Sequence, residues 1–197
     1  MTIRYHAIAT TPLNKKPCLV DSLQRSDLSM DSPATDLMED FSVTRPLKIS
    51  DQLPYEHVRE ILFDTHSDYL LVEDSRHQIV GIIPIEDLMG VRAMIRAQAC
   101  RQRLQELCAR DLMEPVNTLP AVSLSAVRRS IAGNIVATFK HHAANYLLVT
   151  NETGDQVLGL FNSRAVSRNL GIKVEGNFQA MSVAEIAQAI TGHYPKL

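Results

Sequence analysis

The sequence has no tryptophan, few other aromatic residues and only three cysteines. Cys18, Cys100 and Cys108 are odd in number and show no CxxC spacing, so they indicate neither a disulfide framework nor a zinc knuckle. We expect reduced, buried thiols. Aromatic residues make up 5% of the 197 positions, which predicts an aliphatic core and leaves few surfaces on which nucleic-acid bases could stack.

An excess of positive charge and long apolar runs are also missing. The 20 Lys and Arg residues face 22 Asp and Glu residues, and the formal charge of -2 gives no broad positive field for nonspecific nucleic-acid binding. No apolar run approaches the roughly 20 residues that cross a bilayer. The N-terminus lacks the pattern of a signal peptide. We therefore expect a cytoplasmic protein that neither inserts into membranes nor binds nucleic acid.

The common motifs of enzymes and metal sites do not occur either. There is no GxSxG, Walker loop or HExxH, and Gly81 and Gly159 stand alone rather than in a phosphate-binding run. His141 and His142 are adjacent, and no His, Cys, Asp or Glu cluster has the spacing of metal ligands. We expect no catalytic residues, no metal and no required cofactor.

What the sequence does contain is a duplication. The stretch ATDLME recurs as ARDLME, and DYLLV recurs as NYLLV. A single glycine in a predicted strand follows DYLLV, and another follows NYLLV. Three matches in the same order indicate two copies of one structural unit. The matched pairs are 34–39 with 109–114, 68–72 with 145–149, and Gly81 with Gly159.

Each copy is predicted to form a β-α-β-β-α unit, because short β-prone runs alternate with apolar stripes of helical period. The first copy is predicted as a strand at 43–49, a helix after Pro54 with the stripe Val58, Ile61 and Leu62, strands at 69–72 and 79–83, and a helix from Ile85. The second is predicted as a strand at 117–122, one helix carrying Leu124, Val127, Ile131, Ile135 and Phe139, strands at 146–150 and 157–161, and a helix from Ser163 to near Gly171.

The segments outside the copies have weaker patterns. Residues 88–107 are predicted to form a linker helix, and Ser182 followed by Glu185 has the form of a capping box for a last helix at 183–190. The predicted organisation is an irregular tail at 1–32, a first repeat with its linker at 33–107, a second repeat at 108–171 and a C-terminal extension at 172–197.

This arrangement, with Asp-Leu-Met opening each copy and Val-Gly-Ile-Ile leading into Glu-Asp-Leu, resembles the tandem CBS-domain pair known as a Bateman module over about residues 33–171. The resemblance implies an α+β (α/β-like) fold in which two repeats pack with pseudo-twofold symmetry around a cleft with two ligand positions. It implies a regulatory ligand such as AMP, ADP, ATP or S-adenosylmethionine. It also implies a homodimer that acts on a separate, unknown protein target.

The same resemblance implies the residues of the two positions. In the family signature, a hydroxyl at a strand end and the following helix N-terminus bind phosphate, and an acid three residues later binds ribose. Here Asp87 keeps the acid, but Pro84 replaces the first hydroxyl, and Asn162 and Ala165 replace the second hydroxyl and acid. The expected first position comprises Asp87, Pro84, Leu119, Asn145 and Tyr146, and the expected second comprises Asn162, Arg164, Thr44 and Tyr69.

Simpler interpretations stay open for these residues. Asp87 could only complement a helix dipole, and both tyrosines could only pack in the core. The departures from the signature also fit a structural or protein-interaction module whose ligand sites are lost. In the linker, Arg92 and Arg96 lie one turn apart and form either a solvated face or a contact for an anion or acidic partner. The apolar linker residues that could bury against a second subunit are Met89, Met94, Ile95 and Leu104.

Overall fold

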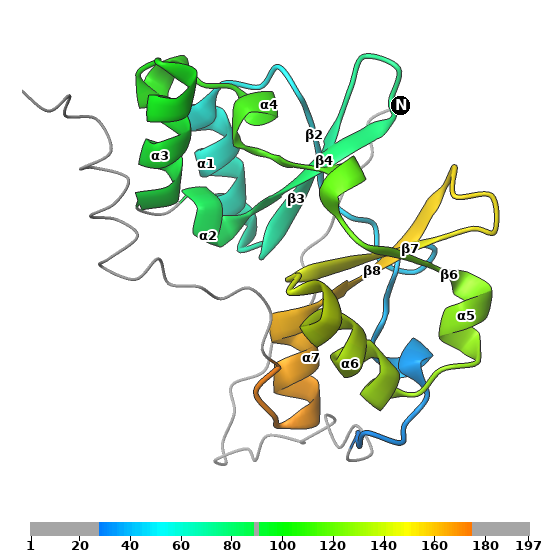
Figure 1. Cartoon of the computed structure of the whole chain (residues 1–197). Helices are drawn as coiled ribbons and strands as arrows, with labels where there is room; N and C mark the ends of the chain where they lie inside the picture. The colour runs from blue at the N-terminus through cyan, green and yellow to red at the C-terminus, as the bar shows by residue number, and fades with distance from the viewer. Residues whose placement is uncertain (1–27, 89–90, 175–197) are drawn as a thin grey trace, which may run out of the picture.

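The computed structural model describes residues 28–88 and 91–174, shown in colour in Figure 1. The predicted helix at 183–190, Cys18, Met89 and residues 1–27 of the predicted tail lie outside these ranges. Two four-stranded sheets form the centre, each with helices against its outer face (Figure 1). None of the helices in the described ranges is long and apolar enough to cross a membrane.

The two sheets have the same topology. The first has the order β2-β3-β4-β5 and the second the order β6-β7-β8-β1. In each, the first pair of strands is parallel and the others are antiparallel. The strands of the first sheet are β2 (Lys48–Ser50), β3 (Tyr69–Glu73), β4 (Ile79–Pro84) and β5 (Glu114–Pro115). Those of the second are β6 (Ala121–Ser123), β7 (Tyr146–Thr150), β8 (Val157–Asn162) and β1 (Glu39–Asp40). The predicted α+β fold with two repeats is confirmed.

Seven α-helices accompany the sheets within the described ranges. Those that pack against the first sheet are α1 (Tyr55–Thr65), α2 (Ile85–Leu88), α3 (Val91–Cys100) and α4 (Ala109–Leu112). In the second half these are α5 (Leu124–Arg128), α6 (Ala132–His142) and α7 (Ser163–Leu170). Helix α7 ends where predicted, because Gly171 adopts the left-handed conformation that suits a helix C-terminus.

Each sheet is completed by a strand that belongs in sequence to the other half. Strand β1 precedes the first sheet along the chain, yet it pairs with β8 of the second sheet, with Glu39 opposite Leu160. Strand β5 follows the linker and pairs with β4, with Glu114 opposite Ile82. The repeated Asp-Leu-Met-Glu stretches are therefore the segments that cross between the halves.

The crossing strands explain the repeated glycines. A Cβ atom on Gly81 would lie 2.8 Å from the Glu114 carbonyl oxygen, and one on Gly159 would lie 2.7 Å from the Glu39 carbonyl oxygen. Only glycine lets the two backbones approach this closely. The duplicated motifs of the sequence are thus contact partners in the fold.

A third core lies between the two sheets. Side chains alternate along each strand, so that Leu70 and Val72 of β3 face the helices whereas Tyr69 and Leu71 face the other sheet. This explains why YLLV is buried throughout. The Tyr69 and Tyr146 rings meet edge to face with their centroids 5.7 Å apart. The members of this central core are Tyr69, Leu71, Ile82, Leu119, Tyr146, Leu148 and Leu160.

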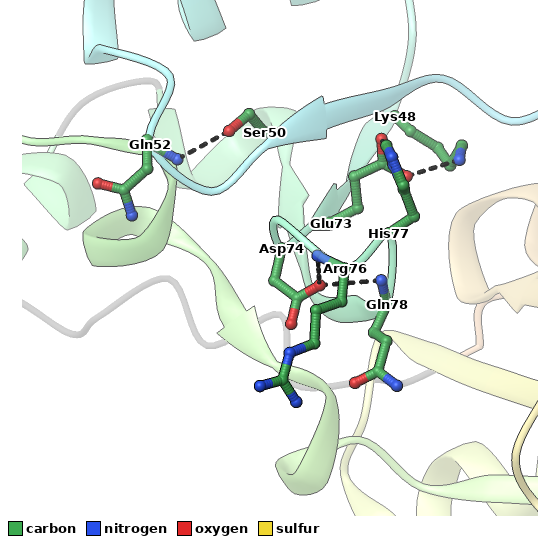
Figure 2. Close-up of polar contacts among 8 residues, drawn as sticks. All are labelled: Lys48, Ser50, Gln52, Glu73, Asp74, Arg76, His77 and Gln78. Carbon is green, nitrogen blue, oxygen red and sulfur yellow. Dashed lines mark hydrogen bonds and ion pairs between the residues drawn. The ribbon is translucent and has the colours of Figure 1, made fainter.

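The β3–β4 hairpin turns at the end away from helix α2 (Figure 1), and polar contacts close this turn (Figure 2). The Asp74 Oδ1 atom accepts hydrogen bonds from the backbone N–H groups of Arg76 and Gln78, at 2.8 and 3.0 Å. The Lys48 Nζ atom lies 2.6 Å from Glu73 Oε2 and ties β2 to β3 (Figure 2). These bonds lower the pKa of both carboxyls.

Two predicted strands are shorter than expected. The strand predicted at 43–49 is wrong before Lys48, because the Asp40 side chain accepts two hydrogen bonds from Ser42 and turns the chain. The strand predicted at 117–122 begins only at Ala121, because residues 116–118 form a 3₁₀ turn.

Two predicted helices are interrupted. The long second-repeat helix divides into α5 and α6 at Ile131, which is extended, forms a β-bridge with Pro33 and donates its N–H to the Asn134 side chain. The linker helix ends at Cys100, because Arg101 adopts a left-handed conformation. Cys100 is exposed in this last turn, so the prediction that it is buried is wrong, and Cys108 is partly buried.

We predict that Gly81→Ala and Gly159→Ala each lower the free energy of unfolding by about 1–3 kcal/mol, because the new methyl group overlaps a backbone carbonyl that cannot move without shifting the crossing strand. Urea unfolding followed by circular dichroism measures this loss. Gly133→Ala is the control and should lose less stability, because its Cβ would lie 3.3 Å from the Met30 carbonyl oxygen, a contact that a shift of a few tenths of an ångström relieves, and because alanine favours a helix. If Gly81→Ala and Gly159→Ala are as stable as the parent chain, the close approach of the crossing strands to these glycines is wrong.

Candidate functional site

A cavity of about 510 Å³ lies between the halves of the chain. Helices α2 and α3 contribute from the first half, the crossing segment after α4 contributes its strand and turn, and the end of α6 contributes from the second half. We call this the first cavity. It is lined by Asp87, Arg92, Ile95, Arg96, Glu114, Pro115, Thr118, Ala143, Ala144 and Asn145.

The Asp87 side chain reaches this cavity from the short helix α2. Strand β4 ends at Pro84, which has no N–H for a further ladder bond, and α2 begins at the next residue. The Asp87 carboxylate is mostly buried and accepts a hydrogen bond from Arg92, with Nη1 2.6 Å from Oδ1. Asp87 is therefore more than a helix-dipole partner, because it is held in an ion pair at the cavity wall.

Two arginines and a second acid complete the charge of the first cavity. Arg92 and Arg96 lie one turn apart on α3, and Glu114 comes from the crossing strand β5. Burial raises the pKa of the Glu114 carboxyl, and the Asp87 carboxylate raises it further, while Arg96 and Arg92 lower it in part. The cavity thus contains two acids and two permanent cations in close proximity.

Asn145 offers an unused polar atom at the same cavity. It stands directly before β7, and its side-chain oxygen is buried without a hydrogen-bond partner among the described residues. A buried polar atom without a partner costs free energy, and a donor on a bound molecule would remove that cost.

A second cavity of about 340 Å³ occupies the pseudo-equivalent place. Glu39 stands where the first cavity has Glu114, Asp68 where it has Asn145, and Ala165 where it has Asp87, by the offsets of the sequence duplication. It is lined by Glu39, Thr44, Arg45, Pro46, Leu47, Ser67, Asp68, Tyr69, Asn162, Ala165 and Arg168. The same positions of the repeat thus form both cavities, with different chemistry in each.

Tyr69 contributes a buried hydroxyl at the second cavity. Tyr69 is 8% exposed, and no group in the described part of the chain makes a hydrogen bond of full geometry to its hydroxyl. Burial is the main cause that raises the pKa of this hydroxyl, and the nearby Glu39 carboxylate raises it further. Tyr69 therefore remains a neutral donor.

The predicted first-position residues separate into two groups. Asp87 and Asn145 line the first cavity together. Leu119 and Tyr146 lie in the central core, and Pro84 is buried at the end of β4. The neighbour of Leu119, Thr118, lines the cavity instead.

The predicted second-position residues also separate. Thr44, Tyr69 and Asn162 line the second cavity. The Asn162 side chain accepts a hydrogen bond from the Arg164 N–H and caps α7. The Arg164 side chain lies beside Glu86 of α2, with Nη1 3.6 Å from Oε2, and lines a neighbouring cavity.

Many residues that line the two cavities were not predicted as site residues, and the sequence held a signal for four of them. Glu39 and Glu114 close the repeated Asp-Leu-Met-Glu stretch, which was interpreted only as a marker of duplication. Arg92 and Arg96 form the basic pair of the linker. Within the described residues, no group of three or more His, Cys, Asp or Glu side chains could hold a metal ion.

No family model matches the sequence, and no curated protein matches it. The structure is similar to that of an uncharacterised conserved protein from Pyrococcus horikoshii, at 13% identity and a TM-score of 0.53, over 72% of this chain and 93% of that chain. It is also similar to the CBS domain of a bacterial CNNM/CorC family Mg²⁺ transporter in complex with ATP, at 15% identity and a TM-score of 0.51, over 72% and 89%.

A third similar structure is a hemolysin-like protein containing a CBS domain from Oenococcus oeni PSU. Its identity is 14% and its TM-score 0.51, over 72% of this chain and 92% of that chain. At these identities the likeness establishes the fold.

We predict that Glu114→Gln raises the free energy of unfolding at pH 7. Because the pKa of the folded Glu114 carboxyl lies above its ordinary value of 4.5, the folded chain binds this proton more tightly than the unfolded chain does. Stability therefore falls as the pH rises from about 4.5 through the folded pKa, and glutamine removes this loss. Urea unfolding at pH 7 and pH 4 tests the prediction.

The gain from Glu114→Gln should be present at pH 7 and shrink at pH 4, where the glutamate is itself protonated. Glu60→Gln, on the exposed face of α1, is the matched control and should change stability little at either pH. An equal gain at both values of pH would show that the charge of Glu114 is not its cause.

Proposed function

We propose that this chain, which has the fold of a tandem CBS module, is a non-catalytic regulatory module that binds an adenosine nucleotide or a related adenosyl compound between its repeats. The observation that carries the proposal is the first cavity, where Asp87 of one half and Asn145 of the other line one space together with two arginines. Its volume falls within the roughly 300–1,000 Å³ of small-molecule sites.

The chemistry of the lining fits each part of such a ligand. A carboxylate such as Asp87 accepts hydrogen bonds from ribose hydroxyls, and a guanidinium offers a fork of donors to phosphate. The Asn145 side chain offers an amide, and Ile95 and Pro115 offer apolar surface. The candidate ligands are AMP, ADP, ATP and S-adenosylmethionine. That a CBS domain of the same fold was solved in complex with ATP supports the proposal.

Sensing follows from the place of the cavity. A ligand that contacts α2, α3 and the start of β7 at once favours the conformation that holds these elements together. It thereby changes the affinity of the chain for any partner that prefers one conformation.

We propose a separate protein as the regulated target and a homodimer as the working form. Phe63 of α1 and Met94 of α3 are exposed apolar side chains suited to a second subunit, whereas Ile95 lines the cavity and Leu104 packs on the first core.

A second function, that of an interaction module without a ligand, is favoured by the second cavity. It has Ala165 in the place of the ribose-binding acid, and the Asn162 side chain is used in capping α7. Because the second cavity lacks these ligand-binding groups and the first cavity keeps Asp87, we assign the ligand to the first cavity.

A thermal-shift panel of AMP, ADP, ATP and S-adenosylmethionine on the full chain tests the proposal. A ligand at about 100 times its dissociation constant adds about 2.7 kcal/mol, which raises the melting temperature by several degrees in a chain of this size. Asp87→Asn should abolish the shift, and Asp64→Ala, exposed on α1, should retain it.

Two outcomes would count against the proposal. A panel without any shift would favour the interaction module. A shift that survives Asp87→Asn would overturn the assignment of the ligand to the first cavity.

A further inference from the structure

Helix α5 lies in a segment that is longer than its counterpart in the first repeat. Strands β2 and β6 occupy equivalent places, because each pairs in parallel with the first strand of its hairpin. The β-bridges of Pro54 and Ile131 are also equivalent, since their partners directly precede the two copies of the repeated Asp-Leu-Met-Glu stretch. Between strand and bridge the first repeat has three residues, 51–53, and the second has seven, 124–130, which include α5 (Figure 1).

In the first repeat this short connection is closed by an ion pair. Asp51 is 3% exposed, and its carboxylate binds the guanidinium of Arg110 from α4. The Arg110 backbone N–H also donates a hydrogen bond to the Asp51 carbonyl oxygen. In the second repeat Thr35 stands in the place of Arg110, and its uncharged side chain cannot form such a pair. The second repeat therefore lacks this closure.

Two cavities of about 580 and 340 Å³ adjoin α5, and we call them the α5 cavities. They lie side by side, because both are lined by Leu124 and Arg128 of α5 and by Leu158 of β8. The volume of the larger one falls within the roughly 300–1,000 Å³ of small-molecule sites. Half-buried apolar side chains form most of its wall: Met38, Phe41, Leu124, Val157 and Leu158.

The charged residues of the α5 cavities are two acids and two arginines. The acids already have donors, since Asp40 accepts two hydrogen bonds from Ser42 and Glu152 accepts one from the backbone of α5. Arg128 and Arg129 are exposed, and in the described part of the chain neither side chain makes a hydrogen bond or an ion pair. Arg128 acts on Asp40 only through its charge, and less than the Ser42 bonds do. The guanidinium donors are thus available to an anion.

We propose that the α5 cavities bind a small apolar molecule that carries a carboxylate. Its apolar part lies against Leu124 and Leu158, and its carboxylate lies at Arg128. Because Arg128 is exposed, its charge contributes modestly, and the apolar contacts provide most of the affinity. This site goes beyond the function proposed above and does not depend on it, since the α5 cavities share no lining residue with the first cavity.

Isothermal titration of the full chain with octanoate, 1-octanol and octylammonium tests this proposal, because the three probes differ only in their polar end. We expect octanoate to bind about threefold more tightly than octanol, and octylammonium to bind more weakly than octanol. Arg128→Gln should remove the advantage of octanoate and leave the affinity for octanol unchanged. Leu158→Ser should weaken all three probes about fivefold or more, because it removes apolar surface that both cavities share.

Two variants serve as controls. Arg59→Gln, at an exposed arginine of α1, should alter no affinity. Leu158→Met should retain binding, because it keeps the wall apolar and so separates loss of that wall from loss of the fold. If octanoate does not bind, the proposal is wrong and another occupant, such as an apolar side chain of a partner protein, covers the α5 cavities. Equal affinities for octanoate and octanol would rule out the role of the carboxylate, and octanoate binding that survives Leu158→Ser would rule out the site.

Discussion

The reciprocal pairing of β1 with β8 and of β5 with β4 is the constraint on which the rest of the molecule depends. Each pairing is only two residues long, but each completes a sheet and fixes where the neighbouring helices can pack. It forces glycine at two strand positions, where a side chain would strike a carbonyl oxygen. It also carries Glu39 and Glu114 to the cavities, since both acids lie in the crossing strands.

The central core holds the two completed sheets face to face. Its Tyr69–Tyr146 contact is made by the same residue of each repeat, and edge-to-face aromatic pairs add about 0.5–1.5 kcal/mol beyond the area that they bury. Salt bridges between the halves, such as Arg168 with Asp68, lie nearer the surface and contribute less. A rigid apolar centre thus separates two polar cavities, which are free to differ in their charges.

Much of this fold could be predicted, because repetition and strand alternation are visible in the sequence. The two YLLV runs are apolar throughout, and each is followed by a short turn and a second apolar run that contains the repeated glycine. The two hairpins and their order along the chain could therefore be predicted. The break at Ile131 was not, because it depends on a bridge to Pro33 from the far end of the chain. For the site, Asp87 and Asn145 could be placed by resemblance. The arginine partner of Asp87 could not, because the direction of α3 is set by the burial of Ala93 and Ala97.

The exchange of strands also bears on how such a molecule can arise. One repeat alone is an unfinished unit, because its opening strand is directed to a sheet that it does not contain. Two separate copies would have to donate strands to each other, and the fraction of paired copies would depend on their concentration. In one polypeptide the donor strand is covalently linked to its acceptor sheet. A short flexible linker gives an effective concentration in the millimolar range. Once joined, the two copies could diverge, and the presence of Asp87 in one copy where the other has Ala165 is a difference of this kind.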